Sequence, residues 1–225
     1  MCLILVAWRK DPACPLVVAA NRDEFHARPA ATAAFWQDHP EILAGRDLQA
    51  GGTWLGVSRV GRFASVTNYR GGHDPKAAES RGALVTRFLL RDGAPGGFIS
   101  GITLPSYSGF NLLAANRDEL WWVSNRGNGP RRLDAGSYAL GNLLLDTPEV
   151  ADVRARFDAT PVAVEPLFGL LASARILAPV YGTRCSTVLM IAADGRVRFA
   201  ERPFDADGNA GPTARFEFEA TASCA

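Results

Sequence analysis

Hydrophobic and polar positions along the chain predict strands that come in consecutive hairpins. The apolar run "CLILVAW" predicts a buried strand, and "DPACP" turns the chain into a second strand, "LVVAAN". Three further pairs of runs are separated by short polar turns: "TWLGVS" with "RFASVTN", "FNLLAA" with "LWWVSN", and "TRCSTVLMIA" with "RVRFAERPF". "ARFEFEA" predicts a last strand. Strands joined by hairpins pair antiparallel, so we expect antiparallel sheets rather than a doubly wound parallel one.

Helical patterns form separate groups between these hairpins. Ser80 is a candidate cap for a helix over "RGALVTRFLLRD", with Gly93 as its stop and one apolar face made of Leu84, Val85, Phe88 and Leu89. Thr147 and Pro148 open "PEVADVRARF", and "EPLFGLLASA" predicts another helix. Residues 25–50 read as a long irregular loop that ends in Gly51 and Gly52, and about 205–213 and 219–225 are expected to be mobile. The pattern predicts an α+β protein whose antiparallel sheets carry helical layers.

Length, composition and charge narrow the class of protein but do not identify a binding partner. With 225 residues, 48% of them apolar, the chain is long enough for one large domain over residues 1–225. A net charge of +1, from 24 basic and 23 acidic residues, gives no electrostatic reason to expect nucleic acid. No run approaches the ~18 apolar residues that a membrane span needs. Nor does the N-terminus resemble a signal peptide. We therefore expect a cytoplasmic protein.

In that compartment the cysteines are expected to be reduced, namely Cys2, Cys14, Cys185 and Cys224. Their spacing, together with three scattered histidines, matches no zinc pattern, so no metal site is predicted.

The hexapeptide "AANRDE" occurs at Ala19–Glu24 and again at Ala114–Glu119. The second copy lies between two predicted strands, where Asn and Asp are good turn residues. It has no reactive Cys, Ser or His beside it in sequence. We interpret the second copy as a hairpin turn.

The first copy is expected to lie next to the thiol of Cys2. Cys2 begins the strand that precedes it, and the predicted hairpin brings Asn21, Arg22 and Asp23 back alongside Cys2. A small residue at position 2 permits removal of Met1, which would give Cys2 a free amine with a pKa of ~7.7–8.0 beside a thiol of ~8.5. Asp23 would then hold the ammonium and Arg22 would favour the thiolate. The alternative is a buried strand cysteine next to an ordinary Arg22–Asp23 ion pair. On these residues both interpretations stay open.

Longer segments resemble a known family. The segments "MCLILVAW", "VVAANRDEFHARP", "GGTWLGVSRVGRFASVTNYR", "GNLLLDTPEV" and "YGTRCSTVLMI" resemble the NRDE family, also called the transport and Golgi organisation protein 2 family. The resemblance runs from Met1 to about Phe204. It implies the four-layer αββα sandwich of N-terminal nucleophile hydrolases, with the choloylglycine hydrolase and penicillin V acylase group as the nearest enzymes.

The same resemblance implies roles for individual residues. Cys2 matches the nucleophile, and Asn21 and Asp23 match an Asn-x-Asp pair in which Asp23 partners the amine. Asn142 matches the oxyanion asparagine and Arg184 a late active-site arginine; the residues expected at the substrate are Asn21, Asn68, Trp54 and Arg81. One departure bears on hydrolysis: the Arg that precedes this pair in the hydrolases is here Ala20, and Arg22 lies inside the pair, on the same strand face as position 20.

Two functions follow. The first is hydrolysis of a carbon–nitrogen bond in a linear amide, with Cys2 attacking, Asn142 and Asn68 stabilising the oxyanion, and no cofactor. The second is a carrier that binds haem, acyl-CoA or lipid without turnover. Haem would need an axial ligand, for which the chain offers Cys2, His26, His73 and the Cys14-Pro15 dipeptide. Propionates or phosphates would need cations, for which it offers Arg22, Arg70, Arg81 and Arg184.

The "GGTWLG" segment fits either function. Its glycines admit a ligand close to the backbone, or they allow a bulge that places Trp54 in the core. The sequence favours the hydrolase, leaves open a homo-oligomer, and gives little support to a scaffold protein.

Overall fold

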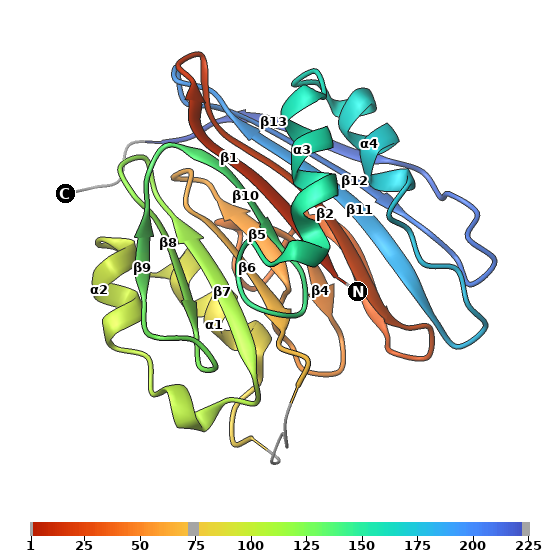
Figure 1. Cartoon of the computed structure of the whole chain (residues 1–225), viewed down its shortest axis with the longest axis horizontal. Helices are drawn as coiled ribbons and strands as arrows, with labels where there is room; N and C mark the ends of the chain where they lie inside the picture. The colour runs from red at the N-terminus through yellow and green to blue at the C-terminus, as the bar shows by residue number, and fades with distance from the viewer. Residues whose placement is uncertain (1, 72–76, 222–225) are drawn as a thin grey trace. The chain divides into compact units, whose positions relative to one another are not determined.

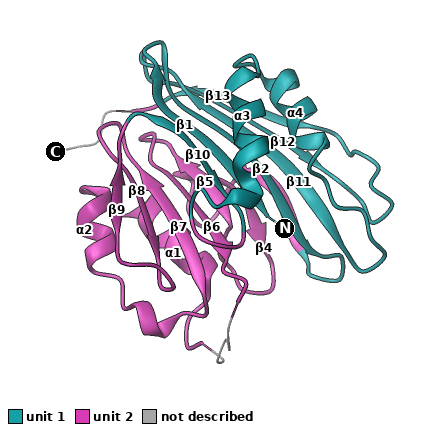
Figure 2. Cartoon of the chain, in the orientation of Figure 1, with its two compact units in different colours: residues 1–29, 135–141, 145–219 teal, residues 30–134, 142–144, 220–225 magenta. Residues whose placement is uncertain are grey.

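The computed structural model describes residues 2–71 and 77–221, and within them the chain divides into two compact units, each built around one antiparallel sheet (Figures 1 and 2). Unit 1 comprises residues 1–29, 135–141 and 145–219; unit 2 comprises residues 30–134, 142–144 and 220–225. Both sheets are flanked by helices, which confirms the predicted α+β class. That residues 1–225 form one domain stays a prediction.

Unit 1 has a six-stranded sheet in the order β10-β1-β2-β11-β12-β13. The strands are β1 (Leu3–Asp11), β2 (Cys14–Phe25), β10 (Gly136–Leu140), β11 (Tyr181–Ile191), β12 (Arg196–Pro203) and β13 (Ala214–Glu219). The predicted β1–β2 and β11–β12 hairpins are confirmed, and β2 and β11 pair antiparallel at the centre of the sheet.

Two helices cover one face of the unit 1 sheet. A 3₁₀ turn, Pro148–Val150, leads into α3 (Ala151–Ala159), and α4 (Val164–Ala172) follows. Their apolar side chains, among them Phe157 and Leu171, join strand residues such as Leu5 and Ala19 in one buried cluster. The helix predicted after Thr147 therefore exists, but its first turn is 3₁₀.

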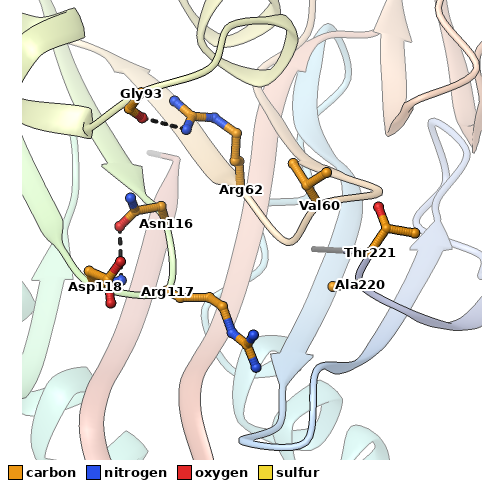
Figure 3. A pocket seen from close by; sticks show the side chains of 8 residues that line it. All are labelled: Val60, Arg62, Gly93, Asn116, Arg117, Asp118, Ala220 and Thr221. Atoms are coloured by element: carbon orange, nitrogen blue, oxygen red, sulfur yellow. Dashed lines mark hydrogen bonds between the residues drawn. The ribbon is translucent and has the colours of Figure 1, made fainter. Parts of the chain in front are cut away.

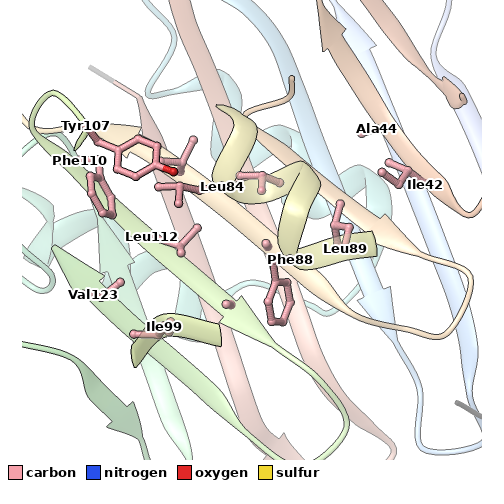
Figure 4. Close-up of a cluster of buried hydrophobic side chains, with 14 of the residues drawn as sticks. Ile42, Ala44, Leu84, Phe88, Leu89, Ile99, Tyr107, Phe110, Leu112 and Val123 are labelled. Carbon is pink, nitrogen blue, oxygen red and sulfur yellow. The ribbon is translucent and has the colours of Figure 1, made fainter. Parts of the chain in front are cut away.

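Unit 2 has a seven-stranded sheet in sequence order, β3 to β9. The strands are β3 (Ala30–Phe35), β4 (Ile42–Asp47), β5 (Leu55–Ser58), β6 (Phe63–Asn68), β7 (Phe110–Ala115), β8 (Leu120–Ser124) and β9 (Arg131–Leu133). Helices α1 (Arg81–Leu90) and α2 (Pro95–Ser100) pack on this sheet through a cluster that includes Leu84, Phe88 and Ile99, and a 3₁₀ turn follows at Leu104–Ser106 (Figure 4).

The apolar face predicted for the first helix is confirmed, since Leu84, Val85, Phe88 and Leu89 are the buried residues of α1. Ser80 is at the N-cap position, but its side chain makes no capping hydrogen bond. The prediction of an irregular loop over residues 25–50 is wrong, because β3 and β4 lie inside it. Alanine-rich "AATAAF" carries little intrinsic strand signal. Pairing with β4, and of β4 with β5, supplies the ladder that makes it a strand.

No helix in the described part of the chain is long and apolar enough to cross a membrane. Cys2, Cys14 and Cys185 are free thiols, and Cys224 lies outside the described residues.

Candidate active site

The β1–β2 hairpin brings Cys2 beside the first "NRDE" copy. Its register pairs Leu3 with Asn21, so the residue before Leu3 lies next to the residues after Asn21. The Cys2 thiol donates to the carbonyl oxygen of Asp23 at 3.3 Å, and the backbone N–H of Asp23 donates to Cys2 Sγ at 3.4 Å. The juxtaposition expected from the sequence is therefore present.

The environment of Cys2 keeps its thiol protonated. Burial raises the pKa of Cys2 from 9.0 to about 11, and the nearby Asp23 carboxylate adds to the rise, while the Arg22 charge opposes it. The thiolate is the nucleophilic form of cysteine, so a thiol with this pKa needs a base before it attacks.

Asp23 is a buried carboxylate held by neighbouring hydroxyl groups. It is 4% exposed, and Thr183 Oγ1 donates to its Oδ1 at 2.6 Å. The hydroxyl of Tyr181 donates to the Asp23 carbonyl at 3.1 Å, and the N–H of Ile176 donates to Thr183 Oγ1 at 2.8 Å. Burial raises the pKa of Asp23, and the Thr183 hydrogen bond works against that rise. The carboxylate is thus fixed beside the Cys2 thiol and coupled to the 174–180 segment.

A β-bulge in β11 sets this arrangement. Thr183 pairs with Asp23 and Cys185 pairs with Arg22, so Arg184 is the extra residue between them. Arg184 Nη1 donates to three carbonyl oxygens, those of Phe25, His26 and Arg28, at 3.0, 3.1 and 3.2 Å. The predicted active-site arginine therefore lies close to the Asp23 strand and holds the segment that follows it.

Arg22 belongs to a buried polar cluster with residues of β11 and β12. It is 6% exposed, with Nη2 at 3.8 Å from Glu24 Oε2. Glu201 is 2% exposed and accepts from Thr187 Oγ1 at 3.2 Å. The Arg22 charge lowers the pKa of Cys185, although burial dominates and raises it. A buried guanidinium in such a cluster provides a fixed positive field beside Cys2.

Both polar atoms of the Asn21 side-chain amide form hydrogen bonds within the protein. It is 2% exposed, its Nδ2 donates to the carbonyl of Leu171 in α4 at 2.9 Å, and its Oδ1 accepts from Ser186 Oγ at 2.6 Å. These bonds tie β2 to α4 and β11, so we leave Asn21 out of the proposed chemistry.

The remaining predicted site residues belong to unit 2. Asn142 Nδ2 donates to the carbonyl of Asn68 at 2.7 Å, which brings the two predicted asparagines together. Asn142 Oδ1 is buried without a hydrogen-bond partner among the described residues. Arg81 Nη1 donates to the carbonyl of Gly109 at 3.1 Å.

Two glycines of "GGTWLG", Gly52 and Gly56, allow close packing within unit 2, whereas Gly51 has a positive φ of 78° and a side chain there would meet no atom within 4 Å. A side chain at Gly52 would meet the backbone of Gly82 at 2.6 Å, and one at Gly45 would meet the Trp54 ring at 2.3 Å. The packing interpretation accounts for the close approach at Gly52, but Trp54 is only half-buried and does not belong to the buried core cluster of unit 2.

The predicted haem ligands are scattered. His26 Nε2 lies 3.0 Å from the carbonyl oxygen of Ala178, and Cys14 Sγ is 3.7 Å from two backbone carbonyls, those of Leu16 and Ile191. His73 lies outside the described residues. Within the described ranges, no group of three His, Cys, Asp or Glu side chains is placed to hold a metal ion.

Sequence reasoning missed two residues of β11 that hold Asp23, Tyr181 and Thr183, and the buried hydrogen-bonded pair Thr187 and Glu201. One signal was available: "TRCST" places polar residues along an otherwise apolar strand, as "NRD" does in β2. Polar residues on two buried strands must satisfy one another, which favours their pairing.

Comparisons with known proteins find related sequences. The family model described as Transport and Golgi organisation 2 matches residues 1–163. The Transport and Golgi organization protein 2 homolog of Homo sapiens is 33% identical, over 97% of this chain and 99% of that protein. The Mus musculus homolog is 32% identical, also over 97% of this chain and 99% of that protein.

Two solved structures have a similar fold. A Caenorhabditis elegans N-acylethanolamine-hydrolyzing acid amidase ortholog superposes with a TM-score of 0.57 at 11% identity, over 83% of this chain and 92% of that chain. A mutant conjugated bile acid hydrolase from Clostridium perfringens superposes with a TM-score of 0.54 at 10% identity, over 100% of this chain and 99% of that chain. At these identities the likeness concerns the fold alone, which is that of N-terminal nucleophile hydrolases.

Proposed function

Since the chain belongs to the Transport and Golgi organisation 2 family and has an N-terminal nucleophile hydrolase fold, we propose that it hydrolyses a carbon–nitrogen bond in a linear amide, with Cys2 as nucleophile after removal of Met1. The observation that carries the proposal is the contact of the Cys2 thiol with the backbone of the buried Asp23. No cofactor takes part.

The reaction begins with proton transfer from the Cys2 thiol to its own freed amine, which Asp23 holds as an ammonium. The ordinary pKa values of an amine and a thiol lie within about one unit of each other, but burial raises the pKa of the Cys2 thiol to about 11, so the transfer depends on Asp23 stabilising the ammonium and on the Arg22 charge favouring the thiolate. The thiolate attacks the amide carbonyl and forms a carbon–sulfur bond. When the carbon–nitrogen bond breaks, the ammonium returns its proton to the leaving amine. Water then attacks the thioester, releases the carboxylic acid and restores the thiol.

The family resemblance assigns oxyanion stabilisation to the side-chain amides of Asn142 and Asn68, and this assignment stays a prediction from the sequence; losing one oxyanion donor typically costs ~10²–10³ in rate. Within unit 2, one N–H of the Asn142 side chain is donated to the Asn68 carbonyl. The charge of the buried Arg22 favours the thiolate. Ala20 stands where the hydrolases have the Arg that precedes the Asn-x-Asp pair, and Arg22 lies inside that pair.

The test is the intact mass of the purified protein, before and after brief treatment with an activated acyl donor. We expect a mass lacking Met1 and one acyl adduct that disappears in Cys2→Ala. Cys14→Ala is the matched control, because burial also raises the pKa of that half-buried thiol, and it should keep the adduct. A protein that retains Met1, or an adduct that survives in Cys2→Ala, refutes the mechanism. Titrations with haem and with acyl-CoA would then test the carrier function.

A further inference from the structure

The second "NRDE" copy forms a hairpin turn, as predicted. Asn116 Oδ1 accepts from the backbone N–H groups of Asp118 and Glu119, both at 2.9 Å, between β7 and β8. The guanidinium of Arg62, near this turn, donates to backbone carbonyls, among them that of Gly93 at 2.6 Å (Figure 3). These hydrogen bonds are internal to the protein, so the turn serves the fold of unit 2.

The outer edge of β13, the side turned away from β12, has the features of a surface that pairs with another strand. β13 is the last strand of the unit 1 sheet (Figure 1), and it pairs with β12 in one continuous register, from Ala214 opposite Glu201 to Glu219 opposite Arg196. No bulge or proline interrupts the six residues of β13. Bulges and prolines are two of the devices by which edge strands avoid pairing with other chains.

The β11–β12 hairpin determines which residues of β13 point outward. The N–H of Ala192 donates to the carbonyl of Arg196 at 2.9 Å, so these two residues form a hydrogen-bonded pair. Opposed residues of an antiparallel ladder alternate between hydrogen-bonded and non-hydrogen-bonded pairs. The residues of β12 that bond to β13 rather than to β11 are therefore Val197, Phe199 and Glu201.

Three residues of β13 direct their backbone N–H and C=O groups away from the sheet. The β12 residues that bond to β13 lie opposite its even-numbered residues, so the odd-numbered ones, Arg215, Glu217 and Glu219, face outward. All three are exposed, and their backbone groups form no other hydrogen bond to the described residues. A row of such groups is a template for a further strand.

The opposite edge of the same sheet is closed by the chain itself. At β10, the N–H of Ala139 donates to Asp146 Oδ1 and the N–H of Asp146 donates to the carbonyl of Ala139, both at 2.8 Å. Leu140 also forms an isolated antiparallel bridge with Leu145. Among the described strands of unit 1, β13 is therefore the one at which another strand can be added.

The charges on β13 favour an identical strand as the partner. When two copies pair antiparallel about a twofold axis at Phe216, Arg215 of each copy lies opposite Glu217 of the other. Opposite charges directly across a ladder stabilise it, and like charges destabilise it. An axis at Glu217 would instead place two Glu217 carboxylates opposite each other, which disfavours that register.

The ion pairs that these side chains form within one copy do not prevent this arrangement. Arg215 contacts Glu165, and Arg198 contacts Glu217, but all four side chains are more than half exposed. Exposed ion pairs contribute little free energy, so their partners exchange at little cost.

We propose that the chain forms a twofold dimer in which the β13 strands of two copies pair antiparallel and join the two six-stranded sheets of unit 1 into one. Each Arg215–Glu217 pair across the interface exchanges two backbone hydrogen bonds, and the opposite charges of the pair set the register. The same surface is used on both copies, as in other twofold dimers. The interface uses no residue of the proposed Cys2 chemistry.

The test is sedimentation velocity of the full chain at protein concentrations from about 1 to 200 µM. We expect a dimer whose fraction rises with concentration. Glu217→Pro should weaken dimerisation more than about tenfold, because proline removes an outward N–H but no hydrogen bond to β12. Its melting temperature should stay close to that of the parent, since proline is tolerated at such positions of an edge strand.

Exchange of charges keeps the test decisive if the proline variant does not fold. Arg215→Glu and Glu217→Arg each place like charges opposite each other, so each variant alone should be monomeric. An equal mixture of the two should form a heterodimer, because both charge pairs are then restored. Arg131→Glu is the matched control: it makes the same charge change on β9, the edge strand of unit 2, and should dimerise as the parent does.

Four results would overturn the dimer. They are a parent that stays monomeric at about 200 µM, whether water or an extended segment of another protein then covers β13, a dimer that survives Glu217→Pro, equal loss in Arg131→Glu, and a mixture of the two charge variants that stays monomeric.

Discussion

Replacing Asp23 with alanine should destabilise the protein far more than the same change at Asp118. The two residues hold the same position in the two "NRDE" copies but differ in surroundings. Asp23 is 4% exposed and accepts from Thr183 Oγ1 at 2.6 Å. Asp118 is exposed, and its carboxylate makes no hydrogen bond to the described residues.

The magnitude follows from what each carboxylate holds. Hydrogen bonds to charged groups contribute about 1.5–3 kcal/mol. Asp23→Ala removes one and loosens Thr183, the hydroxyl that also accepts from Ile176, so we expect a loss of about 2–3 kcal/mol in the free energy of unfolding. Asp118→Ala should stay within about 0.5 kcal/mol, as surface changes usually do.

The assay is urea denaturation of parent and both variants, followed by fluorescence of the tryptophans. Burial raises the pKa of Asp23 above its ordinary value of 3.8, so the folded chain holds this proton more tightly than the unfolded chain. The stabilisation that Asp23 provides is therefore largest below pH 3.8 and declines as pH rises through its folded pKa. The gap between parent and Asp23→Ala should be wider at pH 4 than at pH 8. Equal destabilisation by the two variants, or a gap that widens with pH, would refute the reasoning.

Three further outcomes follow from individual sites. Phe88→Ala, in the fully buried core of unit 2, should cost about 3–5 kcal/mol in urea denaturation, and a loss below 1 kcal/mol would contradict the packing in Figure 4. Gly52→Ala should lower the melting temperature, because its Cβ would lie 2.6 Å from the Gly82 backbone. Gly97→Ala, which adds a side chain in open space on α2, should raise the free energy of unfolding by about 0.5–1 kcal/mol. A Gly52→Ala variant that is as stable as the parent would refute the close approach. In protein that retains Met1, alkylation of Cys2 by iodoacetamide should rise about tenfold per pH unit between pH 8 and 10, because a thiol with a pKa of about 11 is only about one thousandth thiolate at pH 8; a plateau below pH 9 would contradict the burial of Cys2.

The sequence by itself determined the elements whose signals are local. Hairpins with polar turns, such as β1–β2 and β11–β12, and the apolar face of α1 follow from periodicity within a few residues. The contact of Cys2 with Asp23 belongs to this class, because a single hairpin register fixes it.

Only the tertiary structure decided the rest. Alanine-rich β3 is a strand because β4 pairs with it, and Thr183 meets Asp23 because a bulge in β11, some 160 residues away along the chain, shifts the register at Arg184. Asn21 is tied to α4 and β11, and Arg62 is buried beside the second "NRDE" turn, through contacts between segments distant in sequence. Side-chain burial and long-range pairing depend on which surfaces meet in the folded chain. A linear pattern records the periodicity of each segment but not its partner.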